Sequence, residues 1–83
     1  MKALFEKGMV IIYANPKMTD IEEVHAVSKE LEKREFAIGC EDNNEDEFSI
    51  VVCAPTHLII EDIKWEYQEA KKAVKKNAKK VAL

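Results

Sequence analysis

The sequence predicts an α+β fold in which an antiparallel sheet carries two helices on one face. Three patterns lead to this prediction. A strongly apolar run at residues 9–14 is followed by an amphipathic helical pattern, two short alternating segments then flank an acidic loop, and a long 3-4 repeat occupies residues 60–83. With 83 residues, the chain is expected to form one small domain over 1–83.

The first segment allows two interpretations. Met1–Lys7 is either a short edge strand that turns back at Gly8, or one helical turn that Gly8 ends. Met9–Ala14 is apolar on both faces and rich in β-branched residues, so we expect a strand with neighbours on both edges and cover on both faces. Pro16 ends this strand.

A first helix is expected over Asp20–Lys33. Thr19 and Glu22 have the spacing of a capping box, in which each side chain accepts a hydrogen bond from the other residue's backbone N–H. His25 lies at the flank of the apolar stripe, so we interpret it as a boundary residue and not as a ligand. The stripe consists of Ile21, Val24, Val27, Ser28 and Leu31.

Two further strands are expected around a loop at Glu41–Glu47, which contains five carboxylates. Opposed residues in a sheet share a face, so an odd loop length places the large residues of both strands on one side. We therefore predict that Cys40 pairs with Phe48, Ile38 with Ile50, and Phe36 with Val52. The other face would then be small and weakly polar, with Ala37, Gly39, Ser49, Val51 and Cys53.

The last helix is expected to start after Pro55, with Thr56 as its N-cap, and to continue to the C-terminus. At about 1.5 Å per residue it would exceed 30 Å, whereas the strands would span only about 20 to 23 Å. Residues 73–83 are therefore expected to overhang the sheet or to fray. The inward stripe consists of Ile60, Ile63, Tyr67, Ala70, Val74, Asn77 and Val81.

The order β-α-β-β-α, with a right-handed crossover, is similar to most of a ferredoxin-like two-layer sandwich. The usual final strand has no convincing candidate, because residues 79–83 are short and continue the helical repeat. A strand from the N-terminus or from another chain would have to take that edge. This analogy concerns the fold and says little about function.

Charge is distributed unevenly along the chain. Residues 1–69 hold 7 Lys or Arg and all 16 Asp or Glu, a net charge of −9, whereas residues 70–83 carry +6. The basic end suits either nucleic acid, an acidic partner, or a solvated helix C-terminus, where cations are favoured. The basic residues are Lys71, Lys72, Lys75, Lys76, Lys79 and Lys80.

The sequence argues against an enzyme and against a bound metal or other cofactor. The acidic loop lacks the glycine and the glutamate that an EF-hand needs, and no paired Cys-x-x-Cys is present. Cys53 and His57 are the one nucleophile–base candidate, without an orienting acid at a recognisable spacing. Cys40 and Cys53 are predicted on opposite faces, so no disulfide is expected. Because charges come too early for a secretory signal, we expect a cytoplasmic protein.

We therefore expect a small non-enzymatic module for protein–protein interaction or regulation, which associates with a second copy of itself. Trp65 lies opposite the inward stripe, where it either folds back onto the preceding loop or Leu58, or is exposed for a partner. The alternative is nucleic-acid binding through the basic helix end. A third hypothesis is that residues 20–47, with a net charge of −8, bind a basic protein as an inhibitor does. The expected partner-binding residues are Tyr13, Trp65, Val74, Asn77 and Val81.

Overall fold

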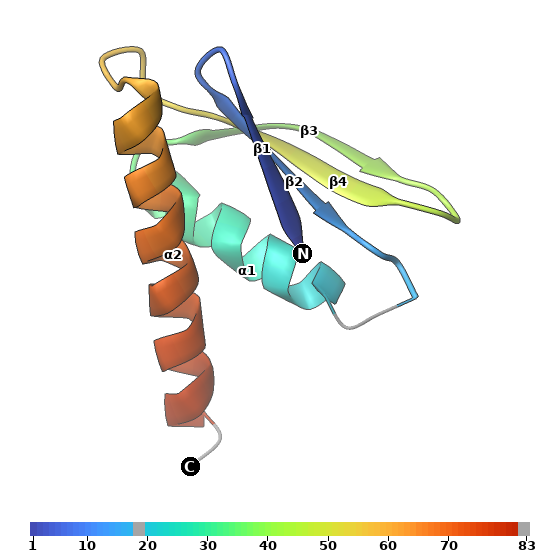
Figure 1. The fold of residues 1–83 in the computed structure, drawn as a ribbon. Helices are drawn as coiled ribbons and strands as arrows, with labels where there is room; N and C mark the ends of the chain where they lie inside the picture. Colours follow the sequence, from blue (N-terminus) through green and yellow to red (C-terminus); the bar gives the residue numbers. More distant parts are fainter. Residues whose placement is uncertain (18–19, 82–83) are drawn as a thin grey trace.

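The computed structural model describes the backbone of residues 1–17 and 20–81 and the side chains of residues 1–17 and 21–77. Within these residues the fold is α+β, with four strands in one antiparallel sheet and two helices (Figure 1). The strand order in the sheet is β1-β2-β4-β3. The elements are β1 (Lys2–Glu6), β2 (Met9–Ala14), α1 (Asp20–Lys33), β3 (Ala37–Asn43), β4 (Phe48–Cys53) and α2 (Ile60–Val81).

The N-terminal segment is a strand and not a helical turn. β1 pairs with β2 from Lys2 opposite Tyr13 to Glu6 opposite Met9. The connecting residues Lys7 and Gly8 both have positive φ, 35° and 80°, as a tight turn between twisted antiparallel strands requires. β1 therefore occupies the edge of the sheet beside β2. In a ferredoxin-like sandwich this edge is taken by the last strand, for which the C-terminal sequence has no convincing candidate.

One hydrophobic core joins the sheet to both helices. Alternate residues of β2 and β4 are buried, as strand periodicity dictates, and the apolar stripe of α1 packs on them. The predicted bounds of β2, α1 and β4 are confirmed. The core residues are Val10, Ile12, Ala14, Val24, Val27, Leu31, Phe36, Phe48, Ile50, Val52, Ile63, Tyr67 and Ala70.

The buried part of the inward stripe of α2 is shorter than predicted and consists of Ile63, Tyr67 and Ala70, with Val74 partly buried. Ile60 is 50% exposed, because it is the first helical residue and has no preceding turn over it. Val74 is partly buried and packs against the core, although it belongs to the residues 73–83 that were expected to overhang the sheet or to fray. Further toward the start of α2, Tyr67 meets Phe5 of β1. Asn77 is exposed, and the side chain of Val81 lies outside the described residues.

The expected N-cap of the last helix is not found at Thr56. Thr56 lies in a turn, and α2 begins four residues later at Ile60. The carboxylate of Asp62 instead accepts a hydrogen bond from the backbone N–H of Ile59, at 3.4 Å. Thr19 lies outside the described residues, so the predicted capping box of α1 stays a prediction.

The predicted register of the β3–β4 hairpin is wrong. Asn43 and not Cys40 pairs with Phe48, and a bulge between Ile38 and Glu41 shifts the remaining pairs. The strands extend further because Asn44 closes a short turn. Its Oδ1 accepts hydrogen bonds from the backbone N–H groups of Asp46 and Glu47, at 3.0 and 2.8 Å.

The corrected register changes the environment of the whole edge strand. All seven residues of β3 are exposed, so Cys40 does not face the core as predicted. Glu41 takes a position on the core side of the sheet, opposite Ile50, where its carboxylate lies 3.3 Å from Nε2 of His25. The prediction of His25 as a boundary residue is consistent with this exposed contact.

Candidate interaction surface

The face of the sheet opposite the core carries an apolar row. We call this face the outer sheet face, and its middle row consists of Leu4, Ile11 and Val51, which lie side by side on β1, β2 and β4. Leu4 is 44% exposed, and the other two are partly exposed. Gly39 on β3 continues this row, because a Cβ there would meet Val51. A solvated sheet face normally carries polar residues at such positions, so this row is the first candidate for a contact surface.

Charged residues flank the apolar row on β1. Lys2 and Glu6 share the outer sheet face with Leu4, because side chains alternate along a strand. Lys2 lies beside Tyr13, and Glu6 lies beside Met9, which is in turn opposite Cys53. The face therefore has a positive and a negative end on β1, with an apolar centre between them.

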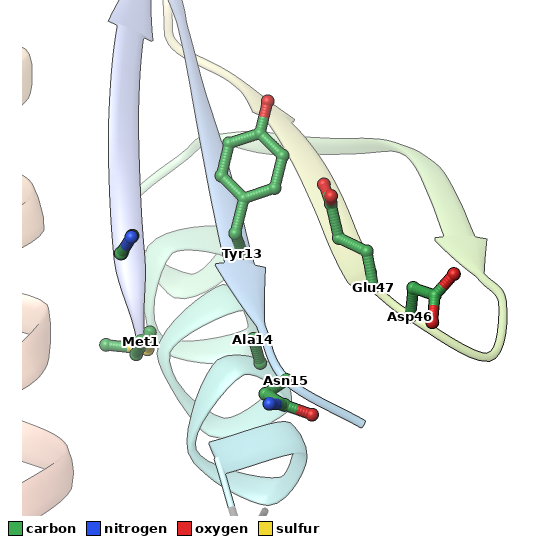
Figure 2. A pocket seen from close by; sticks show the side chains of 7 residues that line it. Met1, Tyr13, Ala14, Asn15, Asp46 and Glu47 are labelled. Atoms are coloured by element: carbon green, nitrogen blue, oxygen red, sulfur yellow. The ribbon is translucent and has the colours of Figure 1, made fainter. Parts of the chain in front are cut away.

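An open hollow of about 610 Å³ lies at the Lys2 end of the outer sheet face. Figure 2 shows Tyr13 on β2 near Glu47, with Asp46 in the turn that follows β3. The pairing of Ala14 with Phe48 places Glu47 near Tyr13, which the sequence predicted as a partner-binding residue. The lining residues are Met1, Lys2, Tyr13, Ala14, Asn15, Asp46 and Glu47.

Trp65 is exposed, and it lines a second hollow on another part of the surface. Its side chain is 59% exposed although Pro55 and Leu58 line the same hollow of about 340 Å³. Arg34 also lines it, and its guanidinium lies 3.6 Å from carboxylate oxygens of both Glu30 and Glu66. These ion pairs join the C-terminal end of α1 to α2 and fix the rim of the hollow.

The basic end of α2 is only partly described. Lys71 covers the Tyr67 ring at 5.5 Å, and Lys72 pairs with Glu69 at 3.2 Å. Lys75 and Lys76 are exposed. The side chains of residues 78–81, which include two predicted basic contacts (Lys79 and Lys80), lie outside the described residues. Figure 1 shows this end of α2 passing beyond α1 and the strands.

Cys53 and His57, which the sequence offered as a nucleophile–base pair, lie on different parts of the surface. His57 lines the hollow at Trp65, whereas Cys53 is exposed on the outer sheet face. In the described part of the chain, no three His, Cys, Asp or Glu side chains are arranged to hold a metal ion. Neither helix, over the residues that are described, has the length and apolar character needed to cross a membrane.

Comparison with protein-family models gives no match, and no curated protein or solved structure is significantly similar to the chain. Tyr13 and Trp65 were predicted from the sequence, whereas Lys2, Leu4 and Glu6 were missed. The sequence signal that could have found them is the alternation of Lys2, Leu4 and Glu6 with the apolar residues Ala3 and Phe5, which is typical of a strand. That signal becomes informative only once β1 is recognised as a strand.

Proposed function

We propose that this protein is a small non-enzymatic interaction module that associates with a second copy of itself through its outer sheet face. The observation that carries this proposal is the apolar row of Leu4, Ile11 and Val51, together with the 44% exposure of Leu4. Contiguous exposed apolar residues on a soluble domain are typical of contact surfaces. Association would remove the row from water.

The proposal includes a ferredoxin-like arrangement in which β1 takes the place of the usual last strand. Antiparallel pairing of β2 with β4, and of β4 with β3, makes β2 and β3 parallel with β4 between them. α1 connects these two parallel strands, as the split β-α-β unit requires. In such a sandwich the face opposite the helices is available for a partner.

A regulatory, inhibitor-like role is compatible with the same proposal. Residues 20–47 carry a net charge of −8, and α1 and the β3–β4 turn present many of these carboxylates. A surface of this charge would favour encounter with a basic protein. Self-association through the outer sheet face would leave α1 free for such a contact.

Nucleic-acid binding is the second candidate function. Exposed Lys75 and Lys76 at the projecting end of α2 favour it. The net charge of −9 on residues 1–69 opposes it, because the body of the domain repels phosphate. If nucleic acid is bound, retention on immobilised DNA or RNA should fall steeply as salt is raised, and Lys75→Glu should weaken it; no retention at low salt would exclude this function.

Sedimentation equilibrium over a concentration series tests the proposed function. The average mass of the wild-type chain should rise from monomer toward dimer as the concentration increases. Leu4→Lys should keep the chain monomeric, because it places a charge in the centre of the apolar row. Ile59→Lys is the matched control, since Ile59 is 61% exposed but lies just before α2, away from the outer sheet face. A wild-type chain that stays monomeric at about millimolar concentration contradicts the proposal.

A further inference from the structure

We infer that the second copy packs face to face on the outer sheet face, about a two-fold axis that runs across the strands along the apolar row. Lys2 of each copy then lies against Glu6 of the other. This inference rests on the proposed function and specifies its geometry. The interface is isologous, because both copies use the same residues.

The positions of Lys2 and Glu6 carry the inference. Both lie on the outer sheet face, two residues before and two residues after Leu4. At about 3.4 Å per residue, each is about 7 Å from Leu4 along β1. Within the described part of the chain neither forms a salt bridge. Rotation by 180° about an axis through Leu4 exchanges the two positions and so pairs opposite charges twice.

The rest of the face fits the same axis. It places the apolar row of one copy on the apolar row of the other. It also places Tyr13 over Met9 and Ser49 over Cys53, which are neutral contacts. No like charges are opposed on β1, β2 or β4. On β3, where Asp42 pairs with Ser49 and Ala37 with Cys53, the same axis places Asp42 over Ala37, so no like charges meet there either.

The other simple two-fold axis is less favourable. The apolar row is centred on β2, so an axis along that strand would also stack apolar residues on each other. It would, however, place Lys2 over Ser49 and Glu6 over Cys53, and both charges would lose water without gaining a partner. Charge complementarity therefore selects the axis across the strands.

A second copy is a better occupant of this face than an unrelated partner because Lys2 and Glu6 carry opposite charges at equal distances on either side of the apolar row. Stacked sheets pack about 10 Å apart, which leaves room for Lys and Glu side chains to meet at the rim. A face of four short strands is smaller than the about 800 Å² per partner of a standard interface. We therefore expect a weak dimer that depends on concentration and salt.

Charge exchange on β1 tests this arrangement. In sedimentation equilibrium at low salt, Lys2→Glu and Glu6→Lys should each weaken dimerisation about tenfold, because each places like charges together at two symmetric contacts. The double variant Lys2→Glu/Glu6→Lys should return to within about threefold of wild type, because the pairs form again with exchanged signs. Circular dichroism should show the same fold for all three.

The matched controls are Lys29→Glu, Glu32→Lys and their double variant, which make the same charge changes at exposed positions of α1. They should leave the dimerisation constant within about threefold of wild type. If the wild type dimerises but the β1 variants behave like these controls, the arrangement is wrong while the proposed function stands. The arrangement is also wrong if the double β1 variant stays as weak as the single ones. A wild-type chain without any dimer overturns both.

Discussion

The ring of Phe5 meets the ring of Tyr67 edge-on, with centroids 5.5 Å apart and ring planes at 79°. Phe5 belongs to the first strand and Tyr67 to the last helix, so this contact joins the two ends of the fold. The Nζ of Lys64 lies 5.7 Å from the centroid of the Phe5 ring and covers it from α2. The short N-terminal strand is therefore part of the folded domain and supports the outer sheet face.

Phe5→Ala should lower the free energy of unfolding by about 2 to 3 kcal/mol, because it removes the aromatic contact and part of the core packing. Leu4→Ala is the matched control on the opposite face of β1 and should cost less than about 1 kcal/mol in dilute solution. Urea unfolding followed by circular dichroism measures both. Equal losses would mean that the two faces of β1 do not differ in burial.

Burial raises the pKa of Tyr67 to about 12, with a further contribution from the carboxylate of Glu23. The native state then holds its phenol proton more tightly than the unfolded state, whose tyrosine pKa is about 10. The stabilisation by neutral Tyr67 is complete below about pH 10 and is lost as the pH rises toward about 12. Phenolate absorbance in a Tyr13→Phe variant, where only Tyr67 titrates, should show this late ionisation.

The stability profile provides the second readout for Tyr67. Tyr67→Phe should remove the part of the alkaline loss of stability that comes from this phenol. The wild type should therefore lose more free energy of unfolding between about pH 10 and pH 12 than the variant does. Identical slopes for the two proteins would contradict a buried neutral phenol.

Val74→Ala tests how far α2 packs on the domain. Val74 is partly buried against the core, so its truncation should cost about 1 kcal/mol. Asn77→Ala, one turn further along the exposed part of the helix, should stay within about 0.5 kcal/mol of wild type. Thermal unfolding of both variants measures the difference. No loss at Val74 would restore the sequence-based prediction that the helix leaves the sheet after Ala70.

The sequence was sufficient for the elements with strong periodicity. The alternating burial of β2 and the 3-4 stripe of α1 follow directly from residue spacing, and their bounds are confirmed. β1 stayed undecided because a five-residue strand and a helical turn can both end at Gly8. Its hairpin pairing with β2 decides the matter, and the residue pattern of segment 1–7 alone does not show that pairing.

The β3–β4 register could not be predicted from parity. With regular pairing, an odd loop length is required to keep the large residues on one face. The bulge between Ile38 and Glu41 adds one residue to β3 and reverses the parity. An even, shorter loop closed by Asn44 then satisfies the same constraint. The residue pattern is equally compatible with an odd loop and regular pairing or with an even loop and a bulge, so it does not distinguish the two registers.

The candidate surface was only partly predictable for the same reason. Tyr13 and Trp65 were predicted from residue type and helical phase, and both line hollows on the surface. Leu4 and its charged neighbours gained meaning only when β1 was placed beside β2. The packing of Val74 against the core was not predicted either, because it depends on how the other elements assemble beside α2.

The most direct test of association through the outer sheet face is the reactivity of Cys53, whose thiol is exposed in the monomer and lies on that face. In a Cys40→Ser variant, Cys53 is the one remaining thiol, and its rate of reaction with a disulfide reagent can be followed over a concentration series. A Leu4→Lys/Cys40→Ser variant provides the monomeric control. We predict that the rate falls as the average mass rises in the first variant and stays constant in the second. A rate that stays constant while the mass of the first variant doubles would contradict association through this face.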